Sequence, residues 1–539
     1  MKKNNFMEGA IIATIAIIVS KILGVLYVIP FYNIIGEQGG ALYGYAYNIY
    51  NIFLIISSAG IPLAISKITS EYETKGEIEK KNAMFIIAKR AIYIFSILSF
   101  LLCFLFAKPI ATLIIGNLTG GNSIEDVTFV IRCVSFALLV VPILSISRGY
   151  LQGHKFISAS SNSQVIEQFV RIAVILLGSF IAIKVLNIPL VYAVGVSVFS
   201  ACVGAIFAYI YLLVKMKQVP KLNKNSLNKI NKSDKKEIIS KIIGYSIPFI
   251  VINIANSLYN TTDMILLIKG LNILGFNATD IETISSIFTT WGSKIISIVN
   301  AFATGLVISL IPSLVSAYTK KDQKEVNLYF NKTLQVLSFI ILPLTIFMSI
   351  FADNIWTIFY GESYYGPIIL RFTILVAYFD SAYIMICSAL QGLYKTKLIY
   401  IAVITGLLVN VLLDIPLILL FNYIGIYPFY GAITATVIGY LISLGIPLYS
   451  LKTKDNFDYS PTLKKLPKVL FTFVILICIC VLYKHLFTYN YSRLFNILYI
   501  SIIGLICLII YYLLNKKIIN ELFGSKINKF TKKFNAKKN

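Results

Sequence analysis

Fourteen apolar stretches run through the chain, and each is long enough to cross a lipid bilayer as a helix. One crossing needs about 20 mostly apolar residues, and inside a bilayer the backbone must satisfy its own hydrogen bonds, as a helix does. Of the 539 residues, 58% are apolar and only 13% are charged. The predicted spans are 8–31, 42–66, 85–107, 127–150, 163–184, 189–214, 242–268, 285–316, 329–352, 366–391, 398–421, 429–451, 467–488 and 494–515. The sequence therefore predicts an all-α membrane protein with 14 transmembrane helices.

Basic residues alternate between the connections of these spans. Lys and Arg concentrate before the first span and in every second connection after it, whereas the other connections carry one or none, apart from the one with Lys484 and Arg493. Basic loops stay on the cytoplasmic side, so we expect a multi-pass protein of the plasma membrane with both termini in the cytoplasm. The net charge of +25 then lies beside anionic membrane lipids, which we expect as partners in place of nucleic acid.

An internal repeat divides the spans into two halves. The segment from Arg132 to Leu151-Gln152-Gly153 recurs from Arg371 to Leu390-Gln391-Gly392, at a constant offset of 239 residues. Because six spans separate the two copies, both have the same orientation, and the repeat is parallel. Transporters built from parallel repeats bind their substrate between the halves and rock one half against the other.

The repeat and the lysine-rich loop between its copies predict the domain organisation. Two six-helix lobes are followed by two helices that have no repeat partner and are expected to pack outside the lobes. The predicted domains are an N-lobe at 1–220 with helices 1–6, a basic cytoplasmic linker at 221–240, a C-lobe at 241–455 with helices 7–12, helices 13 and 14 at 456–515, and a basic cytoplasmic tail at 516–539.

Ionisable side chains inside spans should face a cavity or a partner, because each costs at least ~2.5 kcal/mol in hydrocarbon. Lys21 lies halfway through the first span, and we expect it to face a cavity. Gln164, Glu167, Gln168 and Arg171 lie on one face of the fifth span. Glu167 and Arg171 are also spaced as a helical ion pair. The stripe therefore has two interpretations, a substrate-binding face and a structural pair.

Arginine is rare in this chain, with only six among 48 basic residues. Because nearly all other basic residues of this chain are lysines, an arginine indicates a need for planar, bidentate binding of a phosphate or carboxylate. We assign this role to Arg171 and Arg148, whereas helix packing or lipid headgroups explain the other arginines equally well. Lys294, in the eighth span, either faces a cavity or extends toward the outer surface.

Two spans of the second half combine carboxylates with amides. Asn260 and Asp263 lie on one face of the seventh span, and Asn410 and Asp414 are one helical turn apart in the eleventh. Carboxylate and amide oxygens suit a hard cation such as Na⁺, and the alternative is hydrogen bonding between helices.

The repeat offset relates these residues to the basic residues of the first half. It places Lys21 opposite Asn260 and Arg171 opposite Asn410. Two positions that are basic in the first half are thus occupied by asparagine in the second half, where the carboxylates Asp263 and Asp414 lie nearby. We infer that the N-lobe holds an anionic substrate group and that the C-lobe holds a coupling cation.

Motifs for catalysis are missing from the sequence. The seven cysteines all lie inside predicted spans without a CxxC pair, and there are only two histidines. The loops are short and contain no DxD or histidine cluster, which argues against a membrane glycosyltransferase. We expect a transporter with no catalytic residues.

Several motifs are similar to those of a known family. They are Ser20-Lys21-Ile22-Leu23-Gly24 with Tyr27 and Pro30, Gly39-Gly40-Ala41-Leu42-Tyr43, Gly60-Ile61-Pro62 with Ser66-Lys67, Val130-Ile131-Arg132, Val140-Val141-Pro142, Arg148-Gly149, Gln152-Gly153-His154, and Ser163-Gln164-Val165-Ile166-Glu167-Gln168 with Val170-Arg171. With these motifs the chain resembles, over essentially its whole length, the MurJ and SpoVB-like lipid II flippases of the multidrug/oligosaccharidyl-lipid/polysaccharide (MOP) exporter superfamily.

The resemblance implies a flippase that moves lipid II, the undecaprenyl-pyrophosphate-linked peptidoglycan precursor, from the inner to the outer leaflet by alternating access. A membrane potential or a cation gradient would drive it, and the protein is expected to be monomeric. Lys21 matches a headgroup-binding position of the family, and Lys294 lies near another, whereas the basic position of helix 2 has no counterpart in Phe53–Ile56. The groove for the prenyl chain is expected along helices 13 and 14.

The resemblance also implies a sodium site in the C-lobe. Its expected ligands are Asp263, Asn410, Asp414 and Thr434. Two alternatives keep the fold and change the cargo, to a teichoic-acid or capsule unit, or to a drug exported in exchange for cations. Drug exporters usually have twelve helices, so the two additional helices favour a lipid-linked cargo.

Overall fold

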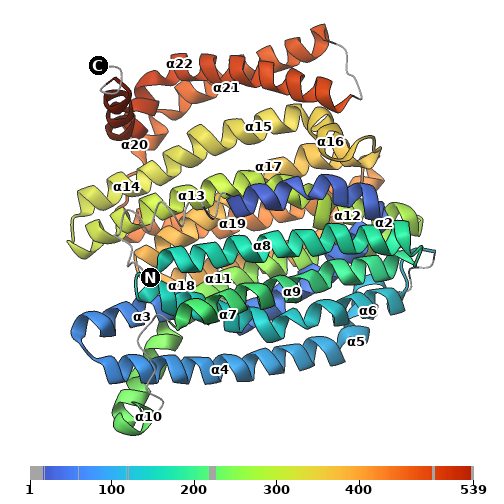
Figure 1. Ribbon diagram of the computed structural model, residues 1–539. Helices are drawn as coiled ribbons and strands as arrows, with labels where there is room; N and C mark the ends of the chain where they lie inside the picture. Colours follow the sequence, from blue (N-terminus) through green and yellow to red (C-terminus); the bar gives the residue numbers. More distant parts are fainter. Residues whose placement is uncertain are drawn as a thin grey trace. The chain divides into compact units, whose positions relative to one another are not determined.

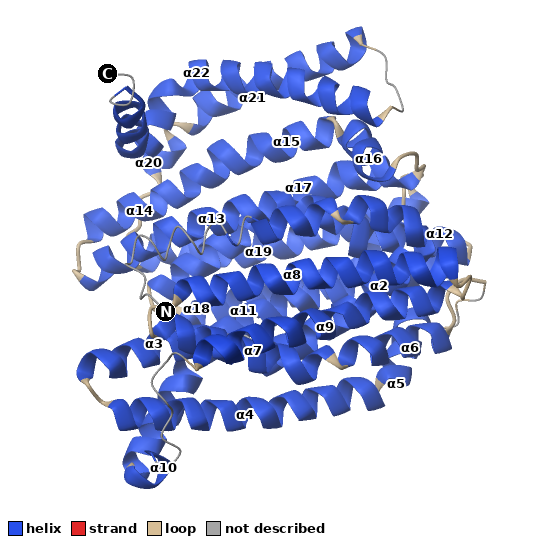
Figure 2. Cartoon of the chain, viewed as in Figure 1, coloured by secondary structure: helices blue, strands red, loops and turns tan. Residues whose placement is uncertain are grey.

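The structure, a computed structural model, describes residues 16, 19–58, 60–116, 118, 120–217, 226–487 and 492–535. Every regular element within these residues is a helix (Figures 1 and 2), which confirms the predicted all-α class. The chain forms two compact units. Unit 1 is Met1–Lys294 with Val403–Thr436, and unit 2 is Ile295–Ala402 with Val437–Asn539.

Unit 1 is built around α2, which lies against α4, α6, α7, α9 and α11. The elements up to the first unit boundary are α2 (Val28–Ser58), α3 (Ile61–Lys75), α4 (Ile78–Leu105), α5 (Ala107–Ile115), α6 (Ile124–Ser135), α7 (Ala137–Gly153), α8 (Ile157–Phe180), η1 (Ile181–Val185), α9 (Leu190–Met216), α10 (Ser226–Lys229), α11 (Lys232–Ile273), α12 (Ala278–Ser286) and η2 (Ile287–Trp291).

The first two predicted spans meet at Gly36. This residue has φ 65° inside α2, a conformation that glycine adopts without steric cost. The eighth predicted span is one continuous run of helix in which α12, the π turn η2 and α13 (Gly292–Thr319) follow one another. A π turn inside an α-helix often marks a functional site, and η2 packs against α2.

Unit 2 begins within α13 and includes the C-terminal helices. Its further elements are α14 (Gln323–Val336), η3 (Leu337–Ile341), α15 (Leu342–Ile350), α16 (Ala352–Tyr360), α17 (Tyr365–Gly392), the start of α18 (Thr396–Tyr423), the end of α19 (Phe429–Lys454), α20 (Ser460–Leu463), α21 (Leu466–Leu486) and α22 (Arg493–Asn535). The helix α21 packs against both α15 and α22 (Figure 1). Phe339, Val469, Phe473 and Ile518 form a small buried core among these elements.

The helices have the length and surface of membrane spans. Eleven helices among the described residues are long and apolar enough to cross a membrane, or twelve if the bent pair Val19–Leu26 and Val28–Ser58 counts as one span. Large apolar side chains point outward on several of them, such as Leu98 on α4, Phe207 on α9 and Leu505 on α22. Exposed apolar surfaces of this kind are unfavourable in water but favourable in contact with lipid chains. The chain is a multi-pass membrane protein.

Candidate functional site

A polar cavity of about 240 Å³ lies inside unit 1. Three elements line it: the middle of α2, one face of α11, and the turn from η2 into α13. The lining residues are Tyr43, Gly44, Tyr47, Asn48, Asn51, Asn260, Asp263, Met264, Phe288, Thr289, Thr290, Ser293 and Lys294. Most of these side chains carry hydrogen-bonding groups, although the surrounding helices are apolar, so the cavity suits a polar ligand.

Hydrogen bonds and close packing fix the cavity wall. The Thr290 hydroxyl donates to the Gly40 carbonyl of α2 at 2.7 Å. A Cβ at Gly40 would lie 2.2 Å from the indole nitrogen of Trp291, so α2 reaches η2 only because this position is glycine. The rings of Tyr43 and Tyr47 stack with their centroids 4.5 Å apart. The wall is therefore rigid on the α2 side.

Lys294 supplies the positive charge of the polar cavity. Its ammonium group lies 5.7 Å from the centre of the Tyr27 ring, a cation–π distance. Lys21 is half-buried on the helix that precedes Tyr27, does not line this cavity and makes no ion pair with any residue that the structure describes. The structure thus brings Lys294, but not Lys21, to the polar cavity.

A second polar group adjoins the cavity through Asp263, and we call it the carboxylate cluster (Asp263, Asn410, Asp414 and Thr436). Asn410 donates to Asp263 Oδ1 at 3.0 Å, and Thr436 donates to Asp263 Oδ2 at 2.7 Å. Asn410 and Asp414 have no exposed surface. These bonds connect α18 and α19 to α11, which explains why residues 403–436, predicted to belong to the C-lobe, pack within unit 1.

The carboxylate cluster has the donor set of a sodium site. Within the described part of the chain, neither oxygen of Asp414 has a hydrogen-bond donor, and the same holds for Asn410 Oδ1. Asp263 is the carboxyl group next to Asp414. Buried acceptors without a donor, next to a second carboxylate, are strongly unfavourable unless a cation or proton joins them. Hard oxygen ligands of this kind fit Na⁺.

The structure brings Thr436 to this cluster instead of Thr434, which was the predicted ligand. The hydroxyl of Thr434 donates to the Tyr430 carbonyl of its own helix at 2.8 Å. Residues two apart on a helix point about 200° away from each other, so both threonines cannot face α11. Among the described residues, no group of three or more His, Cys, Asp or Glu side chains is placed to hold a metal ion.

The arginines predicted to bind an anion share one buried carboxylate. Glu167 accepts from Arg171 at 2.7 Å and lies 2.9 Å from Arg148, so it joins α7 to α8. Arg148 also donates to Ser163 at 2.8 Å. Gln164 is half-buried one turn before Glu167. The structural interpretation of the stripe is thus realised, while two cations on one carboxylate leave a net positive charge.

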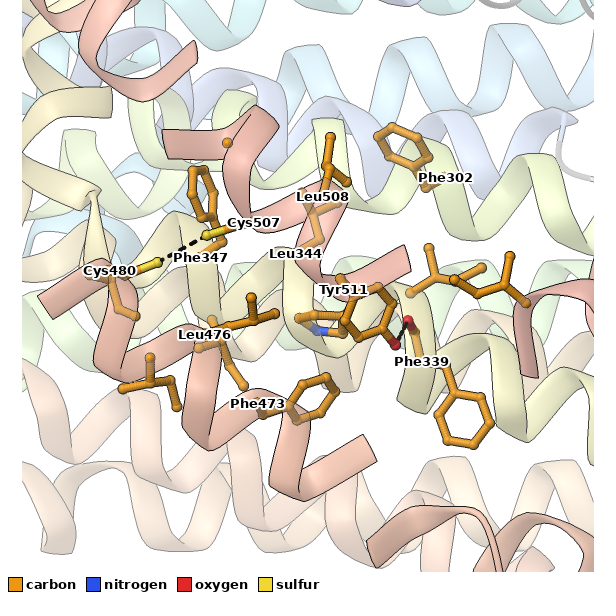
Figure 3. A pocket seen from close by; sticks show the side chains of 17 residues that line it. Phe302, Phe339, Leu344, Phe347, Phe473, Leu476, Cys480, Cys507, Leu508 and Tyr511 are labelled. Atoms are coloured by element: carbon orange, nitrogen blue, oxygen red, sulfur yellow. Dashed lines mark hydrogen bonds between the residues drawn. The ribbon is translucent and has the colours of Figure 1, made fainter. Parts of the chain in front are cut away.

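A separate apolar cavity of about 550 Å³ lies in unit 2 (Figure 3). Apolar side chains of α13, η3, α15, α21 and α22 line it, including Phe302, Phe347, Leu476 and Leu508. The Tyr511 hydroxyl donates to the Phe339 carbonyl at 2.5 Å (Figure 3), so it is already paired within the wall. The cavity can take an apolar chain and offers it almost no polar partner.

Sequence reasoning missed most of the residues that line the polar cavity, among them Asn48 and Asn51. Both line it from α2, in the second predicted span, for which the resemblance implied only a basic residue. Their spacing of three residues in an apolar helix places them on one face and could have been recognised as the same signal that identified Asn260 and Asp263.

Solved structures with the same fold are membrane transporters. The chain is similar to the lipid II flippase MurJ in an inward closed conformation, with a TM-score of 0.66 and 17% identity over 94% of this chain and 100% of that one. It is also similar to an inward-facing multidrug resistance MATE family transporter of the MOP superfamily, with a TM-score of 0.61 and 13% identity over 85% and 98% of the two chains. These similarities show that the protein has the fold shared by MurJ and the MATE transporters.

Sequence comparison identifies the family. The family described as "Polysaccharide biosynthesis protein" matches residues 6–279, and the MatE family matches residues 288–415. The lipid II flippase MurJ of Bacillus subtilis (strain 168) is 32% identical over 471 residues, 86% of this chain and 85% of that protein. Stage V sporulation protein B of the same organism is 23% identical over 365 residues, 67% and 68% of the two chains. The chain belongs to the MurJ-like flippases of the MOP superfamily, which confirms the resemblance found in its motifs.

Proposed function

We propose that this protein translocates lipid II from the inner to the outer leaflet by alternating access. The observation that carries the proposal is the 32% identity, over 86% of the chain, to a relative named lipid II flippase MurJ. The two cavities support it, because lipid II combines an anionic, sugar-bearing headgroup with a long apolar chain.

The headgroup would bind in unit 1. Lys294 lines the polar cavity beside hydroxyl and amide groups that suit sugars, and a lysine is a common partner of phosphate. Lys21 and the pair Arg148 and Arg171 would act along the entry path. A disaccharide-pentapeptide is larger than a cavity of about 240 Å³, so this cavity has to widen before the headgroup enters.

The prenyl chain would lie in the apolar cavity of unit 2. Its walls include α21 and α22, which correspond to the predicted helices 13 and 14. The free energy falls when an apolar chain leaves water or fills an empty apolar groove. Because the chain stays in lipid or in this groove, only the headgroup needs a polar path.

We infer fourteen crossings with both termini in the cytoplasm. Eleven candidate spans coincide with eleven predicted ones. The bent pair Val19–Leu26 and Val28–Ser58, with the break at Gly36 inside its second member, accounts for helices 1 and 2. The run from Ala278 to Thr319 accounts for helix 8. From the internal repeat we also infer two parallel lobes. From the resemblance to the family we infer a monomer.

Sodium would bind the carboxylate cluster. Asp263, Asp414, Asn410 and Thr436 would supply its oxygen ligands, and the ion would reduce the repulsion between the two carboxylates. A cation or membrane-potential gradient can drive transport only if the ion binds the inward and outward states with different affinity. The cluster joins α11 to α18 and α19, so a movement of these helices would change its geometry.

Depletion of the protein in cells that depend on it tests the proposed function. The amount of lipid II in each leaflet is measured, with rescue by the wild type, Lys21→Ala and Lys294→Ala. We expect lipid II to accumulate in the inner leaflet, with rescue by the wild type alone. If lipid II still reaches the outer face at the normal rate in cells without another flippase, the protein carries a different cargo, such as a teichoic-acid or capsule unit.

A further inference from the structure

Two basic residues on the predicted outer side of unit 2 share one carboxylate. Arg371 of α17 donates from one guanidinium nitrogen to both oxygens of Asp353, at 3.0 and 2.9 Å. Lys484 of α21 donates to the same carboxylate at 2.5 Å. The connection after helix 13, where Lys484 lies, was the exception to the alternation of basic loops. The group is therefore placed where lysines are normally avoided.

This group contacts the wall of the apolar cavity at Ile350. Lys484 also donates to the Ile350 carbonyl at 3.3 Å, and Ile350 lines the apolar cavity. Next to Asp353, Asn354 donates to Asn496 of α22 at 2.6 Å. These bonds connect α21 to α15 and α22 to α16 near the two cations.

The group of Arg371, Lys484 and Asp353 has one more cation than a structural ion pair needs. One carboxylate faces two cations, so the group carries a net positive charge, and the side chains of Arg371 and Lys484 are 42% and 36% exposed. Glu362, the carboxylate in the connection between α16 and α17, is exposed and makes no ion pair with the described residues. The cations can therefore take a further anionic partner from the membrane surface.

We propose that Arg371 and Lys484 form a binding site for the diphosphate of a polyprenyl diphosphate lipid, with the prenyl chain in the apolar cavity. The proposal rests on the proposed function, in which such a lipid crosses the membrane on this protein. A cation pair beside an apolar cavity matches the two ends of this ligand. The site would hold the cargo on the outer side before its release.

Asp353 distinguishes this role from a purely structural one. If the three residues only hold helices together, replacing any of them has the same effect, because each replacement breaks the ion pairs. If they bind a diphosphate, Asp353→Asn removes the competing carboxylate and leaves both cations for the ligand. Binding should then be retained or strengthened in Asp353→Asn and weakened in Arg371→Gln and Lys484→Gln.

The test is a binding measurement on the purified full-length protein in detergent, with farnesyl diphosphate and farnesol as probes. We expect Arg371→Gln and Lys484→Gln to weaken farnesyl diphosphate binding about tenfold, the usual effect of one charge-assisted hydrogen bond, and to leave farnesol binding unchanged. Lys395→Gln breaks a similar ion pair, with Asp455 at 2.5 Å, and serves as the control without effect.

Two results would overturn the proposal. One is a loss of diphosphate binding in Asp353→Asn as large as in Arg371→Gln. The other is equal competition by phosphatidylglycerol, which would make the site a general lipid contact. If Asp353→Asn does not fold, Lys484→Glu replaces it, since this variant keeps the pair of Arg371 with Asp353, reverses the excess charge and should abolish binding. Because no transport is measured, this outcome is independent of the leaflet assay for lipid II.

Discussion

Thr290 donates a hydrogen bond of 2.7 Å to the carbonyl of Gly40, and this bond ties the π turn η2 to α2. The two elements come from opposite halves of the predicted repeat and together form one side of the polar cavity. Their contact therefore decides whether the cavity keeps its shape.

Gly40→Ala is expected to destabilise the protein and to reduce transport. The new methyl group would lie 2.2 Å from the Trp291 indole nitrogen, and overpacking of this kind costs about 1–3 kcal/mol. The midpoint of thermal unfolding and the transport rate measure the effect. Gly24→Ala is the control, because a Cβ there meets no atom within 4 Å. Equal behaviour of the two variants would contradict the close contact between α2 and η2.

Sodium is expected to raise the unfolding temperature through the carboxylate cluster. A ligand that binds only the folded state stabilises it according to its concentration and affinity. Asp414→Asn and Thr436→Val should abolish the stabilisation seen on exchanging choline for sodium. Thr434→Val should retain it, since the Thr434 hydroxyl bonds its own helix. Loss of the sodium effect in Thr434→Val but not in Thr436→Val would show that the ligand set is different.

Glu167→Gln is expected to destabilise unit 1 strongly. The carboxylate faces Arg148 and Arg171, and the three side chains are 8%, 15% and 19% exposed. Removing one partner of a buried ion pair costs about 3–5 kcal/mol, because it leaves buried charge uncompensated. Unfolding in detergent measures the loss. Gln164→Ala, one turn away, should have little effect, and a stable Glu167→Gln would mean that the arginines are held by other groups.

The contact between Glu71 of α3 and Lys241 of α11 is expected to weaken in acid. Hydrogen bonds from Lys75, and then from Lys241, hold the pKa of the Glu71 carboxyl below its usual range. A lowered pKa in the folded state gives stability that is complete above the unfolded-state value of about 4.3 and is lost as the pH falls through the folded-state value. The difference in unfolding midpoint between the wild type and Glu71→Gln should therefore shrink below about pH 4. A constant difference would contradict the assignment.

The sequence predicted the spans well because their signal is local. A run of apolar residues defines a helix by itself, and the pair of Glu167 with Arg171 follows from helical spacing alone. The partner Arg148 lies on another helix, α7. Spacing within one segment gives no information about such a contact.

The rotation of each helix was the part that the sequence left open. On α19, Thr434 and Thr436 are both surrounded by apolar residues, so composition does not tell which one faces α11. The same holds for Lys21, which lies midway along its span and yet does not line the polar cavity, and for Asn48 and Asn51, which do. Packing between helices decides these orientations.

Transport of labelled lipid II by the purified protein in sealed vesicles tests the central claim most directly. The measured quantity is the fraction of lipid II that becomes accessible on the opposite leaflet with time, in wild-type and Lys294→Ala vesicles and in vesicles without protein. We expect rapid transfer with the wild type and transfer close to the protein-free rate with Lys294→Ala. Transfer by the wild type at the protein-free rate, with a sodium gradient and a membrane potential applied, would contradict the proposed function.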